Sequence, residues 1–228
     1  HYAINYLSSI VNSRADGVFA SLEPHIGSSQ QWRARIARCL RSYKKWESSV
    51  AEQVLLKVCS QISDDFHEMP GIMNGVIEAN TQLACKALRV FLDCVLDSWL
   101  AKGSTREEEQ HKIKNVEDIS KTDARLDAIM EFKNWCESLF PSGQYWIKPL
   151  AKKASSEEPS LFVDVVLGWL LRCLPKLIQF DDGERWPRDE VFIWAFSDVR
   201  TGDDHLYLID GLKSSLTAIA QSDEDAFL

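Results

Sequence analysis

Residues 83–100 are apolar around most of their circumference when they are drawn as an α-helix. The charged residues of this stretch are spaced three, four and four apart and fall in one narrow stripe: Lys86, Arg89, Asp93 and Asp97. A helix of this kind must be covered by neighbours on several sides, so the pattern predicts a central core helix. We place this helix at about 72–102, after a turn at 69–71 and before Gly103.

A second helix of the same type is expected at about 160–175, with Asp164, Gly168 and Arg172 as its thin polar stripe and Pro175 as its end. Leu88 and Val95 of the first helix and Leu171 of the second are predicted to lie in the core. The fold class expected is therefore all-α, a multi-helix bundle or short helical array built around these two mostly apolar core helices.

Shorter elements surround the two core helices. Amphipathic helices are predicted at about 2–22, with a weak middle at 16–17, and at 29–47, 49–66 and 122–140. Residues 145–151 form a short aromatic passage, and 152–158 form a polar loop. The stretch 187–209 is ambiguous between a hairpin and helices, and two helices at about 187–199 and 204–221 are favoured because everything upstream is helical.

The charged stretch 103–121 is the clearest boundary in the chain. It predicts a linker or loop between an N-terminal helical half, 1–102, and a C-terminal helical half, 122–228. With 228 residues, of which 45% are hydrophobic and 26% charged, the chain can bury a sizeable core. We expect the two halves to form one compact unit.

Cysteine usage indicates the cellular environment. The six cysteines form no CxxC pair and mostly occupy apolar helical positions: 39, 59, 85, 94, 136 and 173. Free core thiols in a reducing compartment are expected, which places the protein inside the cell, in the cytoplasm or nucleus. Because the chain begins at His1 without an initiator Met, it is interpreted as part of a larger protein. No run of eighteen apolar residues exists, so no membrane association is predicted.

A group of cations within residues 31–47 is the main candidate for partner binding. Six basic residues lie there: Arg33, Arg35, Arg38, Arg41, Lys44 and Lys45. With Glu47, the segment carries a net charge of +5; because the chain carries −8, the remainder carries −13. Such asymmetry attracts an acidic partner, either an acidic or amphipathic protein segment or a phosphate backbone. A solvated helix face explains the same pattern without any partner.

Two aromatic residues outside the helical patterns are the other candidates. Trp146 follows a Pro-Ser-Gly turn, and Trp186 precedes Pro187. Aromatic side chains at such places can anchor a protein interface, although they can also fold back onto the core.

One acidic motif suggests chemistry. Asp64, Asp65 and Glu68 provide acids at i, i+1 and i+4, a pattern that can hold Mg²⁺. The pattern is similar to the aspartate-rich DDxxD/E motif of class I terpene synthases, which are also all-helical, but the resemblance covers only five residues. No second metal motif and no zinc, phosphate-loop or nucleophile motif accompanies it.

The function expected from the sequence is therefore a non-enzymatic protein-interaction or scaffold domain without cofactor or metal. A helical nucleic-acid-associated domain that uses the basic residues 33–45 is the first alternative. A Mg²⁺-dependent enzyme centred on residues 64–68 is the second.

Overall fold

The computed structural model describes residues 2–61, 68–94, 96–97, 146–179 and 206–227. Every regular element in these ranges is a helix, as the sequence predicts. The helices are α1 (Tyr2–Ile10), α2 (Ala15–Leu22), the short 3-10 helix η1 (Glu23–His25), α3 (Gln30–Ser42), α4 (Ser49–Cys59), α5 (Met69–Ala79), α8 (Ile147–Glu157), α9 (Pro159–Gln179) and α11 (Leu206–Phe227). A further helix, here called the central helix, comprises residues 81–94 and 96–97.

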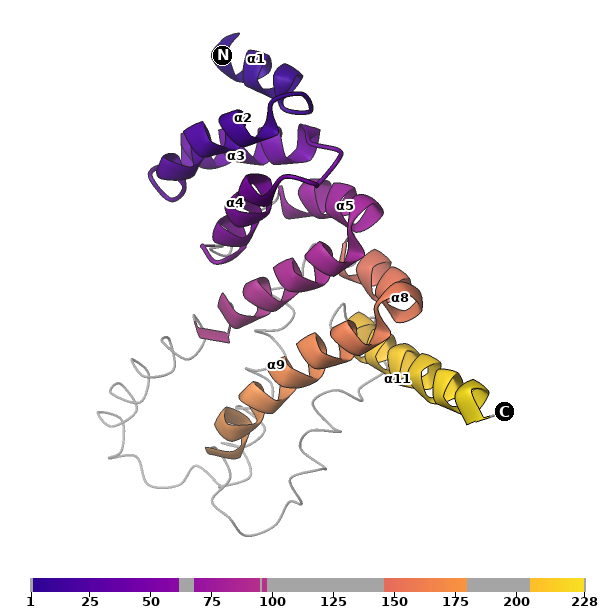
Figure 1. The fold of residues 1–228 in the computed structure, drawn as a ribbon. Coiled ribbons are helices and arrows are strands. Elements are labelled where there is room, and N and C mark those ends of the chain that lie inside the picture. Colours follow the sequence, from indigo (N-terminus) through magenta and orange to yellow (C-terminus); the bar gives the residue numbers. More distant parts are fainter. Residues whose placement is uncertain (1, 62–67, 95, 98–145, 180–205, 228) are drawn as a thin grey trace, which may run out of the picture.

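The helices are stacked roughly in chain order (Figure 1). At the N-terminal end, α2 packs on α4, and α3 packs on both α1 and α5. At the C-terminal end, α8, α9 and α11 pack on one another, and α5 joins the two ends by contacting α8. One continuous cluster of buried apolar side chains extends from Val11 to Leu208. In the described ranges the result is a short helical array around one continuous core.

The predicted first helix is divided in two. α1 ends at Ile10 and α2 begins at Ala15, so the break lies ahead of the weak 16–17 position that the sequence indicated. The backbone N–H groups of Ser13 and Arg14 both donate to the carbonyl of Ile10, which closes α1 with a tight turn. Serine side chains cap the next two helices: Ser29 caps α3, and Ser48 caps α4.

The predicted turn at 69–71 is wrong. Met69 and Pro70 begin α5, since proline is tolerated in the first turn of a helix. The chain breaks instead at Asn80, whose backbone is extended (φ −155°, ψ 90°). The side-chain oxygen of Asn80 accepts a hydrogen bond from the backbone N–H of Leu83 at 2.9 Å and so caps the central helix. The long helix expected at 72–102 is therefore interrupted at Asn80; its last residues, 98–102, lie outside the described residues.

α8 replaces the aromatic passage and polar loop that the sequence suggested at 145–158. Its buried side is Ile147, Leu150, Ala151 and Ala154, which follow helical spacing despite the proline in the first turn. Its polar side closes the junction between α5 and the central helix. Lys153 Nζ donates to the carbonyls of Ile77 (2.8 Å) and Glu78 (3.0 Å), and Thr81 Oγ1 donates to Glu157 at 2.5 Å.

We predict that Lys153→Met lowers the free energy of unfolding by about 1–2 kcal/mol, because two carbonyls at the end of α5 lose a charged donor. The matched control is Lys152→Met, which removes an exposed lysine from the next position and should change the same quantity by less than about 0.5 kcal/mol. Urea denaturation of both variants is the measurement. Equal losses would show that Lys153 does not hold the junction.

The two core helices lie side by side, and their polar stripes meet. Arg172 of α9 forms ion pairs with Asp93 and with Asp97 of the central helix, the second at 3.2 Å. Lys86 pairs with Glu52 of α4 at 3.2 Å. Three of the four charges of the central helix, Lys86, Asp93 and Asp97, are therefore paired with side chains of neighbouring helices.

The core predictions for these helices have mixed outcomes. Leu88 is fully buried, as predicted, whereas Leu171 is 55% exposed and the prediction for it is wrong. Val95 lies outside the described residues. α9 also continues past Pro175 to Gln179, so the proline does not end it and the helix forgoes one backbone hydrogen bond there.

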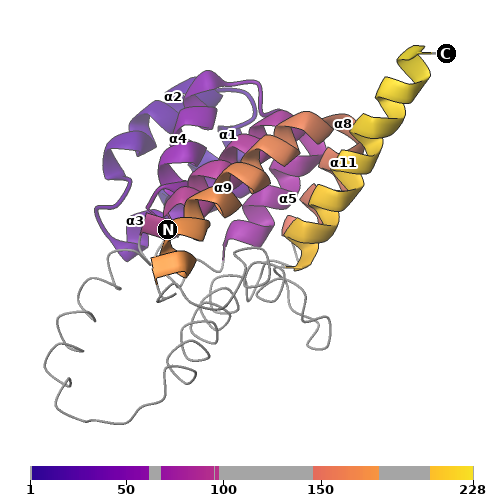
Figure 2. The same ribbon diagram turned by 90° about the horizontal axis from the view of Figure 1, so that it is seen from below.

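The C-terminal segment is helical in its described part, as favoured over the hairpin: α11 begins at Leu206, and residues 180–205 lie outside the described residues. α11 rests on α8 and α9 and extends beyond them toward the C-terminus (Figure 2). The expected linker at 103–121 also lies outside the described residues. In the part of the chain that the structure describes, no helix has the length and apolar character needed to cross a membrane.

Candidate functional site

α3 ends earlier than the sequence indicated, and its end determines where two of the predicted cations lie. Tyr43 follows Ser42 with an extended ψ of 126°, and its N–H donates to the carbonyl of Cys39. Lys44 lies four residues after the buried Leu40 and seven after the buried Ala37. At 100° per residue, a helix continued to Glu47 would turn Lys44 toward the core. Ending the helix at Ser42 keeps Lys44 from this position, and both Lys44 and Lys45 are exposed.

The connection from 43 to 48 is held by specific contacts. Tyr43 is buried, and its hydroxyl accepts hydrogen bonds from the N–H groups of Glu47 (3.2 Å) and Ser48 (3.1 Å). Asn12 reaches across from the end of α1: its side-chain amide donates to the carbonyl of Ser42, and its oxygen accepts from the Lys44 N–H at 2.8 Å. The two lysines therefore project from a braced backbone.

Trp46 adds a strained residue to this connection. Its φ is +50°, in the left-handed region that side chains other than glycine rarely adopt. The indole is buried beside Tyr43, with ring centroids 5.3 Å apart. Burial of a large aromatic side chain offsets the strain of roughly 1–3 kcal/mol that such a backbone conformation carries. Trp46 thus anchors the connection from the inside.

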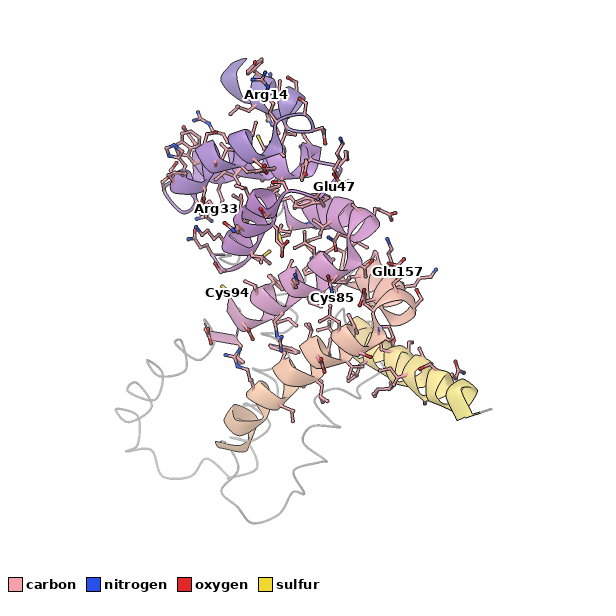
Figure 3. All side chains as sticks on the ribbon, in the orientation of Figure 1. Arg14, Arg33, Glu47, Cys85, Cys94 and Glu157 are labelled. Carbon is pink, nitrogen blue, oxygen red and sulfur yellow. The ribbon has the colours of Figure 1, made fainter. Side chains whose placement is uncertain are left out.

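Arg33 is separated from the other five cations. It is half-buried at the end of α3 nearest α4 (Figure 3). There it lines a small pocket with Ile26, Gly27, Ile36, Val58 and Gln61. At 100° per residue, Arg33 lies between the buried positions Ala37 and Leu40. Arg33 therefore does not share the outer side of α3 with the other cations of residues 31–47. The term basic surface is used below for Arg35, Arg38, Arg41, Lys44 and Lys45.

The basic surface lies on the outer side of α3, between α1 and α5, and on the connection that follows. Arg38 Nη1 donates to the neutral Asn5 side chain of α1 at 3.2 Å. Arg41 Nη1 pairs with Glu68 at 3.2 Å, just before α5. Arg35, Arg38, Lys44 and Lys45 have no carboxylate partner among the described residues. The sequence between Glu23 and Glu47 contains no acidic residue, and among the described residues only Arg41 of the basic surface is paired with a carboxylate.

An aromatic stack closes the N-terminal end of the basic surface. The rings of His25 and Trp32 are nearly parallel, with centroids 3.9 Å apart, and Arg35 Cζ lies 4.7 Å from the centre of the Trp32 ring. A guanidinium over an indole is attracted by the π electrons of the ring. Arg35 is thereby held against α3, and the Trp32 ring is engaged by its own chain.

Of the two aromatic candidates, Trp146 lies within the described residues. Trp146 is only 2% exposed, and its ring meets that of Phe91 edge-on at 5.4 Å. Trp146 therefore folds back onto the core and is not an accessible interface anchor: it immediately precedes α8 and packs against Phe91 of the central helix. Trp186 lies outside the described residues.

Of the three residues of the acidic motif, only Glu68 lies within the described residues. Asp64 and Asp65 lie outside the described residues, and the Glu68 carboxylate is paired with Arg41. Within the described ranges, no group of three His, Cys, Asp or Glu side chains could hold a metal ion.

Three of the cysteines are free thiols within the described core: Cys39, Cys59 and Cys85. All three are buried, and Cys94 is half-buried. Burial raises the pKa of both the Cys59 and the Cys85 thiols to about 12, so both stay protonated near neutral pH. A protonated thiol is a poor nucleophile, and these cysteines act as small core residues.

Comparisons of the chain with protein-family models, with curated proteins and with solved structures give no match.

Proposed function

We propose that this chain is a non-enzymatic interaction or scaffold domain that binds an acidic segment of a partner protein through the basic surface. One observation carries this proposal. Four of the five cations of the basic surface have no carboxylate partner in the part of the chain that the structure describes. In a chain of net charge −8, a concentrated positive surface attracts acidic segments and aligns them on α3.

The braced connection after α3 supports the same function. Lys44 and Lys45 project from a backbone fixed by Asn12 and Tyr43. Binding therefore orders only the side chains of the lysines and leaves the chain conformation unchanged, which lowers the entropic cost of association.

A protein partner fits better than a nucleic acid. The rest of the chain carries −13, which repels a phosphate backbone longer than the basic surface itself. Binding of single strands also relies on aromatic rings on which bases stack. Trp32, beside Arg35, already stacks on His25, so its exposed area for a base is reduced.

The test is a charge-neutralised variant, Lys44→Gln/Lys45→Gln, measured by fluorescence anisotropy with a labelled poly-glutamate peptide at low salt. We expect several-fold weaker binding than for the unaltered protein, because two unpaired cations are lost from the surface. The matched control is Lys152→Gln/Lys213→Gln, which removes two exposed lysines from α8 and α11 and should bind as the unaltered protein does. Equal weakening in both variants would show that only net charge matters.

A labelled single-stranded DNA of the same charge separates the two partner classes. If DNA binds more tightly than poly-glutamate, with log K falling by about 0.7 per neutralised phosphate as log salt rises, the nucleic-acid alternative is favoured. Tighter binding of the peptide supports the protein partner.

A further inference from the structure

Arg41 is the one cation of the basic surface that has a carboxylate partner within the described ranges. Its Nη1 lies 3.2 Å from Oε2 of Glu68, and the two side chains are 51% and 44% exposed. The stem of Arg41 lies along the first turn of α5, where a Cβ built on Gly71 would be 3.0 Å from its Cδ. The pair is therefore formed at the edge of the basic surface, within reach of any segment bound there.

Glu68 occupies the N-cap position of α5, where its carboxylate could accept hydrogen bonds from the helix. It is the residue immediately before α5, and side chains at this position commonly accept hydrogen bonds from the first free N–H groups of the helix. The Glu68 side chain makes no such bond and pairs with Arg41 instead. Its carboxylate therefore lies where an acidic partner would place one of its own.

We propose that Glu68 is an internal competitor for the basic surface. Its carboxylate occupies Arg41 in the free protein, and an acidic segment must displace it to use all five cations. This inference rests on the function proposed above. Since both side chains are about half exposed, the pair exchanges readily with water, and a second carboxylate can take the place of Glu68 without unfolding α5.

The test compares Glu68→Gln with Asp97→Asn, using the labelled poly-glutamate peptide at low salt. Asp97 is a matched control because it also pairs with an arginine at 3.2 Å, is also exposed, and lies at the far end of the central helix beside α9. Both substitutions remove one negative charge and one ion pair. We expect Glu68→Gln to bind two- to fivefold more tightly than the unaltered protein, equivalent to about 0.4–1 kcal/mol at 1.4 kcal/mol per factor of ten. Asp97→Asn should bind as the unaltered protein does.

A second pair of variants assigns the gain to Arg41. In an Arg41→Ala background, Glu68→Gln should give no tighter binding, because the contested cation is absent. Thermal unfolding of each variant establishes that it is folded. If Glu68→Gln binds no better than Asp97→Asn while the unaltered protein does bind the peptide, the competitor role is refuted and the proposed function stands. If none of these proteins binds the peptide, both are refuted.

Discussion

Leu88→Ala should lower the free energy of unfolding by about 2–5 kcal/mol, whereas Leu171→Ala, the same substitution on the other core helix, should lower it by less than about 1 kcal/mol. Leu88 of the central helix is fully buried. Its truncation therefore loses the free energy gained by moving the side chain out of water and leaves a cavity in the core. Leu171 is 55% exposed, so water replaces most of what the truncation removes.

Chemical denaturation followed by circular dichroism measures both variants. The pair is informative because chemistry, helix propensity and side-chain volume are the same at both sites, and only burial differs. A loss at Leu171 as large as that at Leu88 would mean that Leu171 is covered in solution. A loss below about 1 kcal/mol at Leu88 would place the core elsewhere.

Helical periodicity predicted which side of the central helix carries the charged stripe. Residues 83–94 follow the expected pattern, with Leu88 inside and the charges in one stripe. Periodicity was less informative where a helix is apolar on nearly all sides, because the sequence then does not distinguish a covered side from an open one. Leu171 is such a position.

Helix ends were harder to predict because two local signals competed. Proline and glycine at 70–71 indicated a turn, but proline also suits the first turn of a helix, and α5 begins there. The actual break at Asn80 depends on a side-chain cap and on Lys153 from a helix more than 70 residues away. The asparagine was a usable signal; the lysine contact could not be foreseen from one sequence.

The candidate site also combines features that the sequence shows with contacts that only the packing of the helices creates. The cations themselves are visible in the sequence, and so is the absence of acids between Glu23 and Glu47. Their surroundings are not, because Asn12 meets Lys44 and Glu68 meets Arg41 only through the packing of α3 on α1 and α5. Arg33 was grouped with the other cations because sequence spacing alone does not show which side of α3 faces α4.

Gly211→Leu should lower the free energy of unfolding by about 1–3 kcal/mol and loosen α11, although leucine is the better helix former. Gly211 is buried where α11 meets α8 and α9. A Cβ at this position would lie 2.7 Å from Cβ of Ala151 and 2.8 Å from Cε1 of Phe162. Both neighbours are buried, so neither can move aside without opening the core.

Gly17→Leu is the matched control and should change stability in the opposite direction. Gly17 lies in α2, is exposed, and has no atom within 4 Å of a Cβ built on it. There the gain in helix propensity acts alone and should raise the free energy of unfolding by about 0.5–1 kcal/mol. Chemical denaturation shows whether each substitution raises or lowers the free energy of unfolding. Limited proteolysis should cut α11 faster in Gly211→Leu only. If both substitutions stabilise the protein, α11 does not pack through Gly211, and the close approach of α11 to α8 and α9 is wrong.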